Sequence, residues 1–320
     1  MTLHPQAQIV LDALDAAEAS GQPKVEVLSP VEARQQYRDT RGAVTPDPQD
    51  VALVLDITVP GPSGGIPVRY YRPLGSAEGE RLPALIYYHG GGWVIGDIES
   101  HDVICRMAAN EGKFAVFSVG YRLAPEHKFP AAVEDAFAVV EWMSHGAAGM
   151  AIDKTRIAVA GDSAGGTLSA VCTLLARETD FDIAFQALIY PGIEMTHSFE
   201  SHQLFAEGYL LTADSQVWFL DHYFNDDDEK LDWRASPILA EDLSGLPPAY
   251  ILTCGYDPLR DEGQAYAKRL AEAGVPVAHR CFEGQIHAFI TMGKVIDEAN
   301  EAVAEMAHHV KEAFDSRDAR

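Results

Sequence analysis

One hexapeptide, Gly161-Asp162-Ser163-Ala164-Gly165-Gly166, constrains this chain more than any other stretch. It lies between a short apolar strand at 157–160 and a helix of small residues that follows it. A serine with glycines two positions before and after it, at a strand-to-helix turn, is typical of a nucleophile elbow. So tight a turn strains the serine backbone and lifts its hydroxyl above the sheet edge, and side chains at 161 and 165 would collide with neighbours. The alternative is a glycine-rich connection without chemistry, because G-x-S-x-G strings also arise by chance.

The elements expected around this turn alternate between strands and helices. Strands are expected at 51–59, 66–71, 84–88, 114–119, 156–160, 185–190, 249–253 and 277–282. Helices are expected at 6–20, 27–41, 100–112, 131–145, 164–178, 258–273 and 293–315. Such alternation predicts an α/β fold, with a mostly parallel central sheet covered by helices on both faces.

Two segments fall outside the alternation. Residues 1–45 contain two short helices that bury too little to fold alone, so they are expected to form a helical cap segment over the main domain at 46–320. A long aromatic-rich insertion, at about 195–232, interrupts the second half of that domain. It is expected either to add to the core or to form a cap and pocket wall at the ligand-binding edge of the sheet.

The composition narrows the partners. The chain has 320 residues, 47% of them hydrophobic, and a formal net charge of −24. A surface this acidic repels nucleic acid and anionic lipid, so neither is expected as a partner. The sequence shows no signal peptide and no long apolar span, and we therefore expect no membrane insertion and a cytoplasmic location. The four cysteines form no C-x-x-C pair, so buried free thiols and no metal site are expected.

A serine hydroxyl needs a base to take its proton, normally a histidine oriented by a carboxylate. In the α/β-hydrolase arrangement the order along the chain is serine, acid, histidine, with the last two on loops after successive strands. Asp257 follows the expected strand at 249–253, and His287 follows the one at 277–282, so these two are the predicted partners of Ser163. Asp257, which precedes a proline, is also a good candidate for a helix N-cap.

Three other residues are weaker candidates for these roles. Asp261 and Glu262 are alternative acids, but the helix at 258–273 should carry them away from the loop. His279 is an alternative base, but it lies within the expected strand.

The negative charge of a tetrahedral intermediate needs preorganised N–H donors. Glycines 90–92 follow the strand at 84–88, and without side chains their amides can approach a substrate closely. Gly91 and Gly92 are the predicted oxyanion-hole donors, together with Ala164, which follows the nucleophile at a helix N-terminus. The alternative for the glycine triplet is a flexible turn. His89 is expected to hold the loop by hydrogen bonds, and Asp162 to support the site from behind.

Three motifs together resemble a known family: His89-Gly90-Gly91-Gly92-Trp93, the stretch Tyr121-Arg122-Leu123-Ala124-Pro125-Glu126-His127, and the hexapeptide at 161–166. In combination with the Asp257 and His287 regions they resemble the bacterial hormone-sensitive-lipase-like, family IV carboxylesterases, G-D-S-A-G branch. The resemblance implies the α/β-hydrolase fold, the same triad and oxyanion hole, and often a homodimer. Two positions depart from the pattern: Gly120 replaces a common Asp, and Glu194 stands where Asp is usual.

The resemblance also implies hydrolysis of short- to medium-chain carboxylic esters through an acyl-enzyme, without cofactor or metal. The residues expected to line the substrate pocket are Trp93, Tyr190, Leu210 and Trp218. A lactonase, amidase or deacetylase using the same triad stays open, because the same acyl chemistry serves all of them. A ligand-binding receptor on this fold, like the plant gibberellin receptors that lack the triad histidine, is disfavoured by His287.

Overall fold

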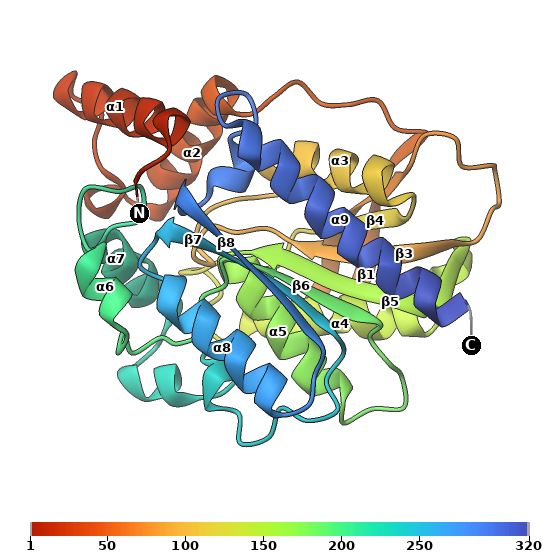
Figure 1. Cartoon of the computed structure of the whole chain (residues 1–320). Coiled ribbons are helices and arrows are strands. Elements are labelled where there is room, and N and C mark those ends of the chain that lie inside the picture. Colours follow the sequence, from red (N-terminus) through yellow and green to blue (C-terminus); the bar gives the residue numbers. More distant parts are fainter. Residues whose placement is uncertain (1, 319–320) are drawn as a thin grey trace.

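The computed structural model describes residues 2–318, and one eight-stranded sheet runs through this part of the chain (Figure 1). The strands lie in the order β1-β2-β4-β3-β5-β6-β7-β8; β2 is antiparallel to both β1 and β4, and the other neighbours are parallel. Their bounds are β1 Leu53–Gly61, β2 Gly64–Arg72, β3 Leu82–Tyr88, β4 Ala115–Val119, β5 Ile152–Asp162, β6 Phe185–Ile189, β7 Ala249–Tyr256 and β8 Val277–Ile286. The predicted α/β class with a mostly parallel sheet is confirmed.

Helices cover both faces of the sheet, so its central strands are buried on both sides. On β3, Leu85 and Tyr87 belong to one hydrophobic cluster and Ile86 and Tyr88 to the other, because successive side chains of a strand point to opposite faces. The first cluster is closed by α3 (Asp102–Gly112) and α9 (Asp297–Asp318), and the second by α4 (Ala131–Ser144) and α5 (Ala164–Ala176). Helix α8 (Arg260–Glu272) packs on the same side as α5, beside β7 (Figure 1).

The first two helices lie at one end of the molecule (Figure 1), α1 at Pro5–Ala19 and α2 at Pro30–Val44. Helix α2 begins three residues later than predicted, because Ser29 and Glu32 form a reciprocal capping box that fixes its start. Arg34 on α2 donates to the carbonyls of Val94 (2.7 Å) and Ala124 (2.7 Å), which ties this helix to loops at the carboxyl ends of β3 and β4.

The chain between β6 and β7 contains α6 (Glu200–Leu204) and α7 (Ala213–Tyr223), joined by irregular segments. Trp218 on α7 donates its indole N–H to the Leu28 carbonyl at 3.2 Å, so this insertion contacts the N-terminal segment directly. Among residues 2–318, no helix combines the length and the apolarity needed to cross a bilayer. Cys105, Cys172 and Cys254 are buried as expected, whereas Cys281 is only half-buried.

Candidate active site

Ser163 occupies a sharp turn between β5 and α5. Its backbone has φ 53° and ψ −119°, a conformation that side chains rarely adopt, and its N–H donates to the Ile189 carbonyl at 2.9 Å. A Cβ on either Gly161 or Gly165 would come within 3.0 Å of the Tyr88 carbonyl oxygen on the adjacent strand. Backbone atoms cannot move aside cheaply, so the turn requires glycine at both positions, as the elbow motif predicts.

Ser163, His287 and Asp257 lie together at the carboxyl ends of three strands. The Nε2 atom of His287 is 2.9 Å from Ser163 Oγ, and its Nδ1 atom is 2.7 Å from Asp257 Oδ2. Asp257 is fully buried and His287 is 6% exposed, so water hardly competes for these bonds. In the neutral histidine, Nδ1–H donates to the carboxylate and Nε2 accepts from the serine, the arrangement a general base needs.

The strands themselves bring the last two residues together. Strand β8 extends to Ile286, four residues beyond its predicted end, after a register shift that pairs Tyr256 with Ile286. Asp257 and His287 directly follow this pair. The shift requires Gly255, because a Cβ there would collide with the backbone of Glu283.

Asp257 is not the N-cap of α8, because Leu259 occupies that position, but its side chain supports the turn that leads into the helix. Its Oδ1 atom accepts the Leu259 N–H at 2.9 Å, so one oxygen supports the turn into α8 and the other holds the histidine. Helix α8 begins at Arg260, two residues later than predicted. Of the weaker candidates, Glu262 bonds to His202 and His279 to Thr253, so the structure does not bring either to the serine.

The glycine loop after β3 has a backbone conformation that requires glycine. Gly91 (φ 118°) and Gly92 (φ 57°) adopt backbone conformations that favour glycine, and a Cβ on Gly92 would enter the ring of Phe219. Within residues 2–318 neither of their N–H groups donates a hydrogen bond, which leaves both available to a substrate oxygen. Ala164 is the first residue of α5, so its N–H has no acceptor within the helix.

His89 holds this loop from behind. Its Nδ1 atom is 2.8 Å from the Gly90 carbonyl, and its own carbonyl accepts the Tyr121 hydroxyl at 2.7 Å, with the two rings stacked 4.3 Å apart. Burial lowers the pKa of His89 to about 4, so the ring is neutral and is suited to a structural role.

Asp162 links the elbow to the glycine loop. Its Oδ1 atom accepts the Gly90 N–H at 3.0 Å and the Tyr87 hydroxyl at 2.8 Å, and its Oδ2 atom lies 3.4 Å from His101 Nε2. Burial opposes the charge, but His101 and Tyr87 together lower the pKa of Asp162, so the carboxylate is ionised.

The four predicted pocket residues have different surroundings. The Tyr190 ring lies 4.8 Å from that of His287, and Trp93 follows the glycine loop and stacks on Tyr223 at 4.3 Å. Leu210 is half-buried in the insertion, beside the cluster that contains Tyr190. Trp218 is buried in the contact between α7 and the N-terminal segment.

Sequence reasoning missed Phe219 and Arg34. The Phe219 ring lies against Gly92, and Arg34 bonds the carbonyl of Val94 beyond that loop. Arg34 lies on α2 and Phe219 on α7, both far from the loop along the chain. One basic or apolar residue on a helix does not indicate in the sequence which distant loop it will contact.

Gly120, one of the two departures from the family pattern, lies in the loop after β4. Its N–H donates to the Pro67 carbonyl at 2.9 Å, and a Cβ there would be 3.3 Å from that same oxygen. A side chain at 120 would therefore sit tightly against β2, away from the serine and the histidine.

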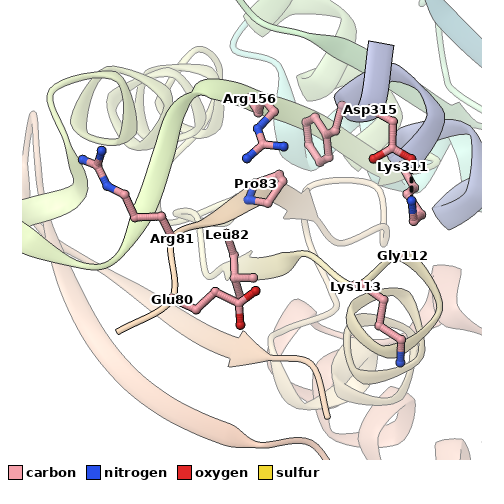
Figure 2. A pocket seen from close by; sticks show the side chains of 10 residues that line it. Glu80, Arg81, Leu82, Pro83, Gly112, Lys113, Arg156, Lys311 and Asp315 are labelled. Carbon is pink, nitrogen blue, oxygen red and sulfur yellow. Dashed lines mark hydrogen bonds and ion pairs between the residues drawn. The ribbon is translucent and has the colours of Figure 1, made fainter. Parts of the chain in front are cut away.

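A separate pocket lies at the amino ends of the central strands, at the end of the sheet opposite the triad (Figure 2). It is lined by Leu82 and Pro83 at the start of β3, together with Arg156 and side chains near the end of α9. The triad lies at the carboxyl ends of the strands, so this pocket is not part of its site.

Comparison with known proteins agrees with the geometry. Residues 85–291 match the model of a protein family that is described as having the alpha/beta hydrolase fold. The chain is 40% identical over 320 residues to the carboxylic ester hydrolase LipN of Mycobacterium tuberculosis, covering 97% of this chain and 84% of that protein. It is 35% identical to an ethyl acetate hydrolase of Pseudomonas putida, covering 95% and 96%.

Solved structures agree as well. An α/β-hydrolase enzyme from the metagenome of Lake Arreo superposes with a TM-score of 0.95 at 42% identity, covering 98% of this chain and 99% of that one. An esterase from Pyrobaculum calidifontis gives a TM-score of 0.88 at 41% identity, covering 97% and 98%. The family model spans more than half of the chain, and the resemblance drawn from the motifs is confirmed: this protein belongs to the α/β-hydrolase family.

Proposed function

We propose that the protein is a serine carboxylesterase in which Ser163, His287 and Asp257 form the catalytic triad. The observation that carries the proposal is the continuous hydrogen-bonded chain from Ser163 Oγ through His287 to Asp257, at 2.9 and 2.7 Å. Relatives named as ester hydrolases or esterases, at 35–41% identity over nearly the whole chain, support the same reaction.

The first half-reaction forms an acyl-enzyme. Ser163 Oγ attacks the ester carbonyl carbon while His287 Nε2 takes the hydroxyl proton. Asp257 keeps the proton of Nδ1 in place and stabilises the imidazolium that forms. His287 then gives its proton to the departing alkoxide, and the alcohol leaves.

The developing oxyanion is met by backbone donors. The N–H groups of Gly91, Gly92 and Ala164 are the proposed donors; the first two donate no hydrogen bond within residues 2–318, and the third lies at a helix N-terminus that adds favourable partial charge. In the second half-reaction a water molecule, deprotonated by His287, attacks the acyl carbon through the same oxyanion site. The acid is released and Ser163 regains its proton.

The proposed substrates are esters with short to medium acyl chains. Trp93, Tyr190 and Leu210 are candidates for the pocket wall, and Tyr190 lies beside the histidine. The segments 1–45 and about 195–232, which contact each other through Trp218, would form the cap. The homodimer and the cytoplasmic location stay predictions from the sequence.

The test is the hydrolysis of p-nitrophenyl butyrate by the Ser163→Ala variant. Loss of nearly all turnover with an unchanged circular dichroism spectrum is expected, because the nucleophile is gone while the fold is kept. Substantial remaining turnover would refute the triad. A rate profile across C2 to C12 esters tests the acyl range, with a maximum at C4 to C6 expected and one at C12 contradicting it.

A further inference from the structure

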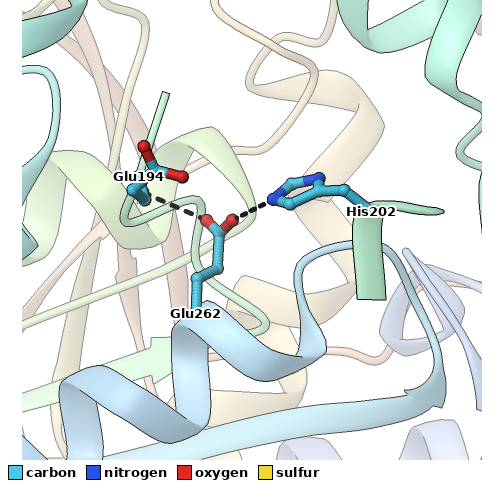
Figure 3. Close-up of side chains that lie close together, drawn as sticks. All are labelled: Glu194, His202 and Glu262. Atoms are coloured by element: carbon cyan, nitrogen blue, oxygen red, sulfur yellow. Dashed lines mark hydrogen bonds and ion pairs between the residues drawn. The ribbon is translucent and has the colours of Figure 1, made fainter. Parts of the chain in front are cut away.

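Glu194, His202 and Glu262 form a buried cluster (Figure 3). Glu194 lies in the loop after β6, His202 on α6, and Glu262 in the first turn of α8. His202 Nε2 is 2.7 Å from Glu262 Oε2, and the Glu262 side chain is fully buried. One histidine and two carboxylates are residue types that often bind metal ions. The role of this cluster is therefore inferred from the hydrogen bonds that its side chains make.

The carboxylates of the cluster accept hydrogen bonds from the neighbouring backbone and from His202. Glu262 Oε1 accepts the N–H groups of Ile193 (2.6 Å) and Glu194 (3.2 Å), and Glu262 Oε2 is engaged by His202. Glu194 in turn accepts the N–H groups of Thr196 (2.8 Å) and Ser198 (2.9 Å). The carboxylate oxygens already face donor hydrogens, and the His202–Glu262 contact has the length of a charge-assisted hydrogen bond. The cluster is thus a buried unit whose carboxylates are satisfied by hydrogen bonds.

Helix α6 is joined to the turn that follows Asp257 by three further bonds. The Ser201 hydroxyl donates to the Pro258 carbonyl at 2.5 Å and accepts the Asp261 N–H at 3.3 Å, and the Ser201 N–H donates to the Asp261 carboxylate at 3.0 Å. With the His202–Glu262 pair, four bonds from two adjacent residues hold the six-residue turn that begins at Asp257. Glu262 also holds the loop after β6, so the turn is fixed on both sides.

On the basis of the proposed esterase mechanism, we propose that His202, through Glu262, is a positioning residue for the triad acid Asp257. Its neutral or protonated ring keeps the first turn of α8 in place, and this turn sets the direction of the Asp257 carboxylate. His202 lies in the insertion between β6 and β7. This insertion would therefore support Asp257 in addition to forming part of the proposed cap.

The consequence is specific to the histidine of the triad. Asp257 stabilises the imidazolium that His287 becomes when it takes the serine proton, so a displaced carboxylate stabilises this charged ring less. The acid limb of the kcat/KM profile then moves to lower pH. A displacement approaching 1 Å in such a group costs about 10-fold or more in kcat, while KM changes little. Loss of stability alone would move neither quantity in the folded enzyme.

The test compares three variants in the full-length protein with p-nitrophenyl butyrate. His202→Leu removes the donor to Glu262; His202→Gln keeps a side-chain N–H that can replace it. Leu270→Ala is a stability control: Leu270 lies on α8, the helix that carries Glu262, and is fully buried away from the cluster. We expect His202→Leu to lower kcat about 10-fold and the acid limb by about half a pH unit, with most of both restored in His202→Gln. Leu270→Ala should lower only the melting temperature.

Ser201→Ala keeps the proposal testable if His202→Leu does not fold. It deletes one oxygen and two of the four bonds, and a smaller shift of the acid limb in the same direction is expected. Unchanged profiles in the folded His202→Leu and Ser201→Ala variants, or an equal shift in Leu270→Ala, would overturn the positioning role. An active Ser163→Ala variant would instead refute the esterase mechanism, so the two failures are distinguishable.

Discussion

Replacing Asp162 by alanine tests how the oxyanion loop is held. The carboxylate accepts the Gly90 N–H at 3.0 Å and the Tyr87 hydroxyl at 2.8 Å, and it is 3% exposed. Alanine removes the carboxylate oxygens that accept these bonds, and at so buried a position few water molecules can replace them. We therefore expect the glycine loop to lose the bond that directs its first peptide.

The magnitude is worked from the two closest donors to Asp162, the Gly90 N–H and the Tyr87 hydroxyl; His101, at 3.4 Å, loses a longer contact in addition. A buried donor that loses its acceptor costs about 1–3 kcal/mol, so the two groups together predict a loss of about 2–6 kcal/mol in the free energy of unfolding. If the rotated Gly90 peptide also turns one oxyanion donor away, the barrier rises by about 3 kcal/mol and kcat falls by about 100-fold. Asp162→Asn keeps one acceptor oxygen, so a smaller effect on both quantities is expected.

The assays are urea unfolding and steady-state hydrolysis of p-nitrophenyl butyrate. Tyr87→Phe is the matched control, because it removes the Tyr87 bond to Asp162 and leaves the bond from the Gly90 N–H in place. It should lower stability and leave kcat near that of the parent. If folded Asp162→Ala keeps kcat within about threefold of the parent, the oxyanion loop is not held by this carboxylate and the reasoning is wrong.

Three further predictions concern other parts of the site. Gly165→Ala should abolish folded, active protein, because its Cβ would meet the Tyr88 carbonyl; a folded and active variant in circular dichroism and hydrolysis assays would contradict this. His89 is buried with its pKa lowered to about 4 from 6.5, so the unfolded chain binds a proton over this range before the folded one does. Unfolding free energy should therefore fall by up to about 3 kcal/mol as pH drops from 6.5 to 4, and His89→Gln should flatten this part of the curve measured by urea titration. Arg34→Lys, which loses the fork that bonds the Val94 carbonyl, should lower the unfolding free energy by about 1–3 kcal/mol in the same titration; an unchanged value would show that α2 is held by other contacts.

The sequence by itself determined the local chemistry of the site. Glycines flanking Ser163 predict the elbow because only a residue without Cβ fits against Tyr88, and the structure places those atoms as the motif requires. The alternation of strands and helices predicts the parallel sheet, because each element has to bury an apolar face. The order of strands then predicts that Asp257 and His287 meet Ser163 at one edge.

Only the tertiary structure decided how these groups are held. The end of β8 was predicted four residues early, because the register shift at Gly255 depends on a neighbouring strand. His202 was not singled out, because its bond to Glu262 joins residues 60 positions apart on two different elements. Sequence patterns record turns and periodicity within an element, whereas contacts across the fold depend on where the packed elements place their side chains.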